Sequence, residues 1–236
     1  MCTLSYIPIG ESDFFFTTNR DESPKRVAHF PSRYEMNESS AIFPKDVEAS
    51  GTWMMCHENR FSICLLNGAF KWHKHQPPYR KSRGVVVLEL TEYISVIDFV
   101  RQYNFDNIEP FTIIVLRYDG VRILEEIRWD GDSIHYRNLD ANLPRIWSSS
   151  TLYDDVAGVR RETWFNAWLD SQKEFSKESI LDFHKTAGKE DQFNALVMNR
   201  KDIVKTLSIT QIRKDKSQTS MYYEDLQKGE FNEISI

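Results

Sequence analysis

Residues 2–22 of the chain, CTLSYIPIGESDFFFTTNRDE, decide the fold that the sequence predicts for its N-terminal part. The apolar runs 2–8 and 13–19 indicate two strands, and the Gly10-Glu11-Ser12 segment between them indicates a turn. The stretch therefore predicts a β-hairpin, in which the start of the chain lies beside the residues that close the second strand.

The register of this hairpin gives Cys2 specific neighbours. Antiparallel pairing about the turn places residues opposite each other whose numbers add up to roughly 21 or 22. We therefore expect Cys2 to face Asn19 or Arg20, with Asp21 just beyond. The hairpin would bring an amide, a guanidinium and a carboxylate to a thiol at the start of the chain.

Cys2 can act as a nucleophile that carries its own base. We expect Met1 to be removed because cysteine is a small second residue, and Cys2 would then hold a free α-amine beside its thiol. The unperturbed pKa of such an amine is about 8 and that of a thiol is about 8.5, so a modest shift activates both groups. An amine beside a nucleophile on the same residue is a known way to activate a weak attacking group.

Composition and net charge limit the classes of protein to which the chain can belong. With 41% hydrophobic residues in 236, the chain can bury a sizeable core, and no change in composition marks a linker, so we expect one domain over residues 1–236. The net charge of −5 argues against a nucleic-acid partner. His73 and His75 have a spacing compatible with a metal, but they lie in a Lys-rich and Pro-rich loop without a carboxylate cluster. The sequence therefore predicts no metal and no cofactor.

The expected location is the cytoplasm. No apolar run approaches the length of a membrane-spanning helix, and the N-terminus lacks the basic and apolar regions of a signal peptide. The three cysteines form no pair or CxxC motif, which indicates a reducing compartment. Oligomeric state is not readable from these features.

The rest of the chain predicts runs of strands and runs of helices that are segregated, which favours an α+β fold with mostly antiparallel sheets. We expect residues 23–50 to be irregular, and this segment and loop 69–82 to wall the binding pocket. We expect Asn67 to lie at the end of a buried strand. Strands are predicted over 51–56, 61–66, 111–118, 121–129, 133–138, 145–149, 193–199, 206–212 and 220–226, and helices over 83–103, 153–175 and 176–185 with Ser176 as N-cap.

Several motifs together resemble a known family. They are Met-Cys-Thr-Leu at 1–4, Thr-Asn-Arg-Asp-Glu at 18–22, Gly-Thr-Trp at 51–53, Leu-Leu-Asn-Gly at 65–68, Pro-Tyr-Arg-Lys-Ser-Arg-Gly at 78–84 and Thr-Leu-Ser-Ile-Thr at 206–210. The set is similar to the NRDE family, also called the transport-and-Golgi-organisation-2 family, over most of the chain. That family resembles the N-terminal-nucleophile (Ntn) hydrolases, especially the cysteine branch with penicillin V acylase and bile-salt hydrolase.

The resemblance implies a four-layer αββα sandwich with the nucleophile at the start of a central strand, and amide-bond chemistry. It implies Cys2 as nucleophile, its α-amine as base, and Arg20 and Asp21 as the residues that hold this N-terminus. Asn67 is the candidate donor of the oxyanion hole, which stabilises the charge that develops on the carbonyl oxygen.

Three further residues are candidates for contacts with the substrate. Asn19 is one of the neighbours that the hairpin predicts for Cys2. Ser149 stands where many members of the family have asparagine, and a hydroxyl is a shorter and less fixed donor than an amide. Arg160 or Arg161 could bind an anionic group of the substrate.

The function predicted first is an Ntn-type cysteine amidohydrolase that cleaves a non-peptide C–N bond of a small molecule. Acyl transfer to a small amine differs only in the acceptor. The alternative is a non-catalytic protein that binds or traffics a metabolite, because the eukaryotic members of the similar family look tied to the handling of haem or lipid metabolites and to Golgi organisation. The Ser149 departure favours this alternative slightly.

Overall fold

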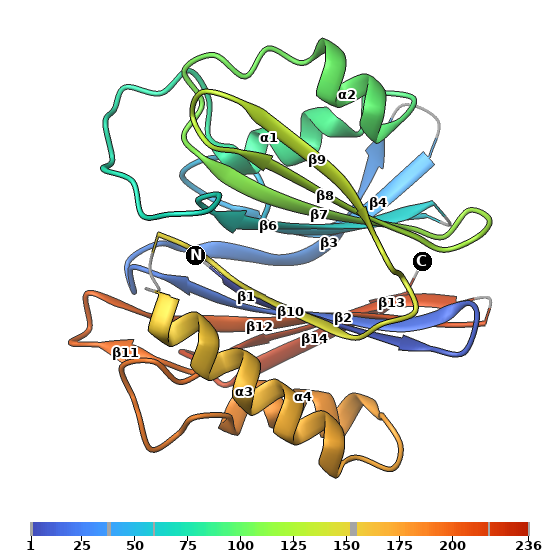
Figure 1. Ribbon diagram of the computed structural model, residues 1–236, viewed down its shortest axis with the longest axis vertical. Helices are drawn as coiled ribbons and strands as arrows, with labels where there is room; N and C mark the ends of the chain where they lie inside the picture. The colour runs from blue at the N-terminus through green and yellow to red at the C-terminus, as the bar shows by residue number, and fades with distance from the viewer. Residues whose placement is uncertain (1, 37–38, 59, 152–154, 217, 236) are drawn as a thin grey trace.

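The computed structural model describes residues 2–36, 39–58, 60–151, 155–216 and 218–235. Within these residues, two antiparallel sheets stack face to face, and a pair of helices covers the outer face of each sheet (Figure 1). The layers are therefore helices, sheet, sheet and helices. This arrangement confirms the expected α+β fold, a four-layer αββα sandwich with antiparallel sheets.

The first sheet holds the N-terminal hairpin. Its strands are β1 (Cys2–Ile9), β2 (Asp13–Glu22), β10 (Arg145–Ser148), β11 (Asn199–Arg200), β12 (Val204–Asp215), β13 (Gln218–Asp225) and β14 (Glu230–Ser235). They follow the order β10-β1-β2-β12-β13-β14, and β11 pairs with β12. The Cα partner of Cys2 is Arg20, which confirms the predicted register of the hairpin.

The second sheet has its strands in sequence order, each paired with the next. They are β3 (Ala28–Met36), β4 (Ser39–Asp46), β5 (Met54–His57), β6 (Phe61–Asn67), β7 (Phe111–Arg117), β8 (Ile123–Trp129) and β9 (Ile134–Leu139). The predicted hairpins of this sheet are confirmed, because β5 pairs with β6 and β7 pairs with β8.

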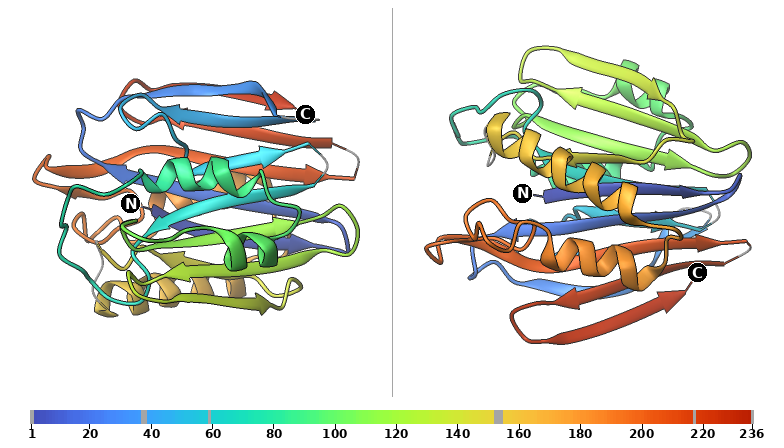
Figure 2. Two further views of the ribbon diagram at one scale, coloured as in Figure 1. Left: turned by 90° about the horizontal axis from the view of Figure 1, so that it is seen from above. Right: turned by 60° about the horizontal axis from the view of Figure 1, so that its bottom comes forward.

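In the described part of the chain, four helices form the outer layers. α1 (Arg83–Leu90) and α2 (Val96–Gln102) cover the second sheet, whereas α3 (Asp155–Ser171) and α4 (Lys177–Thr186) cover the first (Figures 1 and 2). Ser176 caps α4 as predicted, since its side chain accepts a hydrogen bond from the backbone N–H of Ser179.

The side chains of the N-terminal hairpin pack into two hydrophobic clusters, because successive side chains of a strand point to opposite faces. Leu4, Tyr6 and Phe16 are buried in the core between the two sheets. Ile7 and Phe15 are buried in a separate cluster with residues of α3 and α4. Burial of each such side chain contributes roughly 1.5–3 kcal/mol, so the hairpin is held from both faces.

The prediction that residues 23–50 are irregular was wrong, because β3 and β4 lie in this segment. Pro31 and Pro44 had indicated loop structure. The pairing of β3 with β4 shifts register between His29 and Ser32, and both prolines fall at this bulge. A bulge interrupts the ladder of hydrogen bonds, so a residue without a backbone N–H is tolerated there.

Three other parts of the secondary structure differ from the prediction. The helix expected over 83–103 is divided into α1 and α2, because Ser95 caps a new helix. Of the strand expected over 193–199, only Asn199 lies in a strand, since the segment before it forms turns that begin with the hydrogen bond from Asn194 N to Asp191 O. β14 was not predicted. The expected start of the third helix at Tyr153 lies outside the described residues.

Candidate active site

A cavity of about 420 Å³ lies where the ends of the two sheets meet the start of α1. Its lining includes Arg20 from β2, Asn67 from β6 and Arg83 from α1. Residues 46–53 and 75–82 contribute further walls, in agreement with the expectation that segments 23–50 and 69–82 would do so. Two candidate site residues far apart in the sequence, Arg20 and Asn67, therefore share one cavity.

The motif at 19–22 is divided between two faces of the first sheet. Arg20 and Glu22 line the cavity, whereas Asn19 and Asp21 are fully buried on the side of the helices. The alternation of side chains along β2 causes this division. Half of the motif therefore reaches the cavity, and the other half reaches α4 and the turns that follow it.

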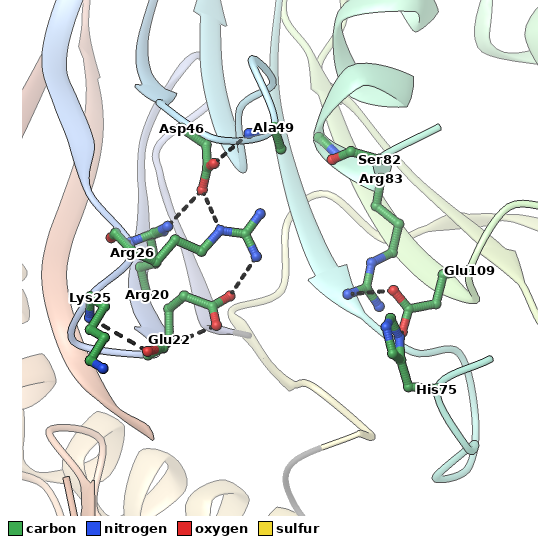
Figure 3. Close-up of polar contacts among 12 residues, drawn as sticks. Arg20, Glu22, Lys25, Arg26, Asp46, Ala49, His75, Ser82, Arg83 and Glu109 are labelled. Atoms are coloured by element: carbon green, nitrogen blue, oxygen red, sulfur yellow. Dashed lines mark hydrogen bonds and ion pairs between the residues drawn. The ribbon is translucent and has the colours of Figure 1, made fainter. Parts of the chain in front are cut away.

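One wall of the cavity is a network of ion pairs around Asp46 (Figure 3). Its Oδ2 atom lies 2.8 Å from Nη2 of Arg20 and 2.8 Å from Nε of Arg26. Arg26 also pairs with Glu22 at 3.4 Å, and Arg20 stacks over the ring of Trp53 at 4.5 Å. This network holds the Arg20 side chain at the cavity.

The pKa values on this wall follow from the network. Burial would raise the pKa of Asp46, but the backbone N–H of Ala49 and the guanidinium groups of Arg26 and Arg20 outweigh it, and the pKa lies below its usual value. The pKa of Glu22 is also lowered despite burial, by the backbone N–H of Ser23 and the same two arginines. Both carboxylates are therefore ionised at neutral pH.

A second cluster, around Glu109, lies across the cavity from Asp46 (Figure 3). Its carboxylate lies 3.0 Å from Nη2 of Arg83, 3.0 Å from Nδ1 of His75 and 3.2 Å from Nε2 of His73. Burial opposes ionisation, yet Arg83 and the two histidines lower the pKa of Glu109. The cluster ties the loop that follows β6 to the start of α1.

Sequence reasoning had assigned no role to the charged residues of the second cluster or to Asp46. Arg83 lies in the motif at 78–84, which by itself indicates only the family resemblance. Asp46 and Glu109 carried no signal, because each becomes part of a site only through pairing with arginines distant in sequence.

Asn67 ends β6 at the cavity, and its side-chain amide has no hydrogen-bond partner among the described residues. Its backbone carbonyl accepts a hydrogen bond of 2.6 Å from Oγ of Ser149. Ser149 directly follows β10, a strand of the first sheet. Gly68 follows with φ +80°, and a Cβ atom there would overlap Ser150. Residues 149–151 therefore contact Asn67 and Gly68 and fix the backbone position of Asn67.

Cys2 begins β1, between β2 and β10. Arg20 is its Cα partner on one side, and on the other side Thr3 pairs with Ser148, so the same register continued by one residue leads to Ser149. The side chain of Cys2 lies outside what the structure describes. Its backbone nevertheless places the residue next to Arg20, whose guanidinium lines the cavity.

Asn19 belongs to a buried polar network on the helix side of the sheet. Its amide nitrogen donates to the carbonyls of His184 and Leu196 at 3.1 and 3.0 Å, and its oxygen contacts Nδ1 of His184. Nε2 of His184 lies 2.6 Å from Oγ of Ser5. Burial, and then the positive charge of Arg161, lower the pKa of His184 to about 3, so its ring is neutral. Asn19 does not line the cavity.

The other candidates also lie on the helix side. Asp21 accepts a hydrogen bond of 2.6 Å from the hydroxyl of Thr206. Arg160 is half exposed on α3 and pairs with Asp191 at 2.9 Å. Arg161 is buried and donates to the hydroxyl of Thr3 and to the carbonyls of residues 194 and 195. Neither arginine lines the cavity.

The described part of the chain contains neither a metal-binding cluster nor a membrane-spanning helix. His, Cys, Asp and Glu residues there form no group of three or more that could hold a metal ion. No helix in the same part is both long and apolar enough to cross a membrane.

Solved structures with a similar fold are named as a hydrolase, an amidase and an acylase. A variant of conjugated bile acid hydrolase from Clostridium perfringens has a TM-score of 0.63 and 10% identity, and the match covers 99% of this chain and 92% of that one. The N-acylethanolamine-hydrolyzing acid amidase ortholog of Caenorhabditis elegans has a TM-score of 0.59 and 11% identity over 89% and 92%. Penicillin V acylase from Agrobacterium tumefaciens has a TM-score of 0.56 and 10% identity over 100% and 86%.

These structures are Ntn hydrolases, and at such low identity the likeness shows the fold, which is the Ntn-hydrolase sandwich. No curated protein sequence matches the chain at a comparable level of significance. The family described as Transport and Golgi organisation 2 matches residues 1–138, which is more than half of the chain. The chain therefore belongs to the Transport and Golgi organisation 2 family.

Proposed function

We propose that this protein is an Ntn-type cysteine amidohydrolase that cleaves the C–N bond of a small-molecule amide, with Cys2 as nucleophile after removal of Met1. One observation carries the proposal. Arg20, the Cα partner of Cys2, and Asn67, at the end of a strand in the other sheet, line the same cavity. The Ntn-hydrolase fold and its amidohydrolase neighbours support it.

In the proposed reaction the α-amine of Cys2 takes the thiol proton, and the thiolate attacks the amide carbonyl. The positive charge of Arg20 favours the thiolate, and Asp21 orients the ammonium that forms. The ammonium then protonates the leaving amine, the C–N bond breaks, and a thioester remains on Cys2. Water activated by the amine hydrolyses the thioester, or a small amine accepts the acyl group instead.

Asn67 supplies the oxyanion donor in this proposal. Its side-chain amide has no partner within the described residues and lines the cavity, so its N–H groups are available to a developing negative charge. The carbonyl of Asn67 is held by Ser149, which fixes the backbone that carries this donor. A backbone N–H would provide a second donor.

We place the protein in the cytoplasm, on the ground that the three cysteines of the sequence show no CxxC motif or even pairing. Cys56 and Cys64 are buried, and burial raises the pKa of Cys56 to about 12. Neither can serve as an exposed nucleophile, because the reactive form of cysteine is the accessible thiolate. Cys2 is therefore the cysteine to which a reaction is assigned.

A second candidate function is the binding or trafficking of a metabolite, such as haem or a lipid, without turnover. The Ser149 hydroxyl favours it, because its one proton is donated to the carbonyl of Asn67. A hydroxyl has a single proton, so Ser149 is not free to act as a second oxyanion donor. Under this second candidate function, the protein keeps the cavity and binds a metabolite there but catalyses no reaction.

Intact-mass spectrometry of the purified protein, with and without an electrophilic amide mimic, tests the proposal. We expect a mass without Met1 and an adduct on the native protein, and no adduct on the Cys2→Ala variant. Turnover of an amide library should disappear in Cys2→Ala while the thermal unfolding midpoint is retained. Retained Met1, or equal turnover by the two proteins, would refute the cysteine mechanism.

A further inference from the structure

The end of the sandwich that holds the cavity also carries most of the exposed large hydrophobic side chains of the described chain. Twelve such side chains are exposed, and all but Ile94, Val121, Leu143 and Phe231 lie at this end. They belong to the segments that follow β2, β4 and β6, to the start of α3 and to the surroundings of β11 (Figure 1). Apolar groups gathered on one surface mark a site of interaction.

The loop that follows β6 presents the largest of these side chains. Phe70 is 50% exposed, and the Arg128 guanidinium lies 5.0 Å from its ring. Two residues beyond Trp72, the loop is held again, because Nε2 of His73 and the carboxylate of Glu109 are 3.2 Å apart. Trp72 itself is 70% exposed and makes no ring contact with the described residues. The loop is therefore fixed on both sides of an indole that faces solvent.

The start of α3 lies beside this loop. The hydroxyl of Ser150 donates to the backbone carbonyl of Lys71 at 3.4 Å, and the chain continues from there into α3. In its first two turns the helix exposes Val156 and Val159, each by 61%. Two segments distant in sequence thus add to one surface. We call its side chains the apolar rim: Phe70, Trp72, Val156 and Val159.

The loop of the apolar rim is basic. Residues 70–83 contain five lysines or arginines and no aspartate or glutamate, although the net charge of the chain is −5. Arg80, Lys81 and Arg83 are bonded to other parts of the protein. Lys71 and Lys74 are exposed, and neither forms an ion pair within the described ranges. Two lysines without a carboxylate therefore flank Trp72.

This combination of side chains fits a lipid surface better than a protein partner. The centres of protein interfaces are depleted in lysine, whereas tryptophan and lysine occur together at the boundary between a bilayer and water. There the indole lies at the level of the headgroups, and lysine extends its ammonium to the polar phase. The cytoplasmic leaflet is also negatively charged and attracts basic segments.

We infer that the apolar rim docks the protein on the surface of an anionic lipid bilayer, with Trp72 among the headgroups and Lys71 and Lys74 against their negative charges. The same loop supplies His75 and Tyr79 to the lining of the cavity, so docking turns the cavity toward the bilayer. The inference goes beyond the proposed reaction and does not depend on it. It applies equally to a hydrolase and to a protein that only binds a metabolite.

Sedimentation with vesicles tests the docking directly. The purified protein is mixed with vesicles of phosphatidylcholine alone or of phosphatidylcholine with phosphatidylserine. We expect binding to the anionic vesicles to be tighter by about tenfold or more, because each of the two lysines gains from the surface charge. Added salt should weaken this binding by screening. No binding to either vesicle, or equal binding to both, would overturn the inference.

Substitutions of exposed residues assign the binding to the apolar rim. Trp72→Ala should weaken it by about fivefold or more through the loss of apolar contact, and Lys74→Gln by about fivefold. The matched controls are Ile94→Ala, which removes a side chain that is 90% exposed, and Lys173→Gln, at an exposed position beyond the end of α3. Both should bind as the native protein does, and a loss as large in the controls would refute the assignment.

The remaining measurements separate other occupants and the reaction. Thermal unfolding should give the same midpoint for all four variants, since each changes an exposed side chain. Analytical ultracentrifugation without vesicles should show no dimer that Trp72→Ala removes. Such a dimer, without vesicle binding, would assign the apolar rim to a second copy of the chain and overturn the lipid surface. The Cys2→Ala protein should bind vesicles like the native protein, so loss of turnover and loss of docking are distinguishable.

Discussion

The Arg20 guanidinium of β2 and the Asp46 carboxylate of β4 form a buried ion pair of 2.8 Å that joins the two sheets at the cavity. Their side chains are only 5% and 9% exposed. Because Asp46 also accepts hydrogen bonds from Arg26 and from the backbone of Ala49, one carboxylate orders much of this wall.

Asp46→Ala should therefore destabilise the protein strongly. Removal of one partner leaves Arg20 as a buried charge without its carboxylate, which costs about 3 kcal/mol or more in the free energy of unfolding. Urea denaturation measures the loss. The control is Asp215→Ala, which breaks the exposed pair with Arg213 and should cost less than about 1 kcal/mol. A similar cost for the two variants would contradict the role given to Asp46.

Gly51→Ala should also destabilise the protein, because the new Cβ atom would collide with the backbone of Gly84. We expect a cost of about 1–3 kcal/mol, as for other overpacked sites, measured by thermal unfolding. Gly158→Ala is the control, since a Cβ atom at this position in α3 meets no atom within 4 Å. Alanine there should stabilise the helix by up to about 1 kcal/mol, and a stable Gly51→Ala protein would disprove the close contact.

His184 should make stability depend on pH. In the folded protein its pKa is about 3, whereas an unfolded histidine has a pKa of about 6.5. Its neutral form is stabilising above pH ~6.5, and that contribution is lost as the pH falls toward 3, because the unfolded chain takes up the proton first. The free energy of unfolding should fall by up to about 1.4 kcal/mol per pH unit in this window.

The slope of stability between pH 7 and pH 5 is the quantity to measure. In His184→Gln the slope should be smaller, whatever the variant's stability at pH 7. His57, whose pKa is also lowered chiefly by burial, contributes equally to both proteins and does not disturb the comparison. The same slope in both proteins would show that His184 does not titrate as described.

Asn67→Ala should separate activity from stability. The side-chain amide has no hydrogen-bond partner within the described residues, so its loss should change the free energy of unfolding by less than about 0.5 kcal/mol. If Asn67 holds the oxyanion, kcat should fall about 10²–10³-fold. Unchanged kcat with a substrate identified by the amide library would remove Asn67 from the mechanism.

Ser149→Ala should affect the same site indirectly, through the backbone of Asn67. It removes the hydrogen bond to the carbonyl of Asn67 and should cost about 1 kcal/mol of stability. Under the proposed function kcat should fall more than KM changes, because the donor is less well held. Ser133→Ala, which removes an exposed hydroxyl bonded to Asp132, is the control for both measurements and should leave them unchanged.

Local patterns were sufficient for several parts of the fold. The register of Cys2 with Arg20 follows from a short turn and the alternation of apolar residues, and both are properties of adjacent residues. The N-cap Ser176 follows from its own side chain in the same way. β3 and β4 were missed because proline is a reliable sign of a break only where the ladder needs its N–H, and the bulge removes that need.

What the sequence by itself determined is the hairpin that sets Cys2 against Arg20, the class of fold, and Asn67 at the end of a buried strand. Only the tertiary structure decided that Arg20 and Asn67 share a cavity, that Asn19 and Asp21 turn away from it, and that Asp46, Arg83 and Glu109 complete its walls. The physical reason is distance along the chain. Pairing within a hairpin depends on neighbouring residues, whereas the cavity forms where two sheets and a helix meet, and no local pattern encodes that meeting.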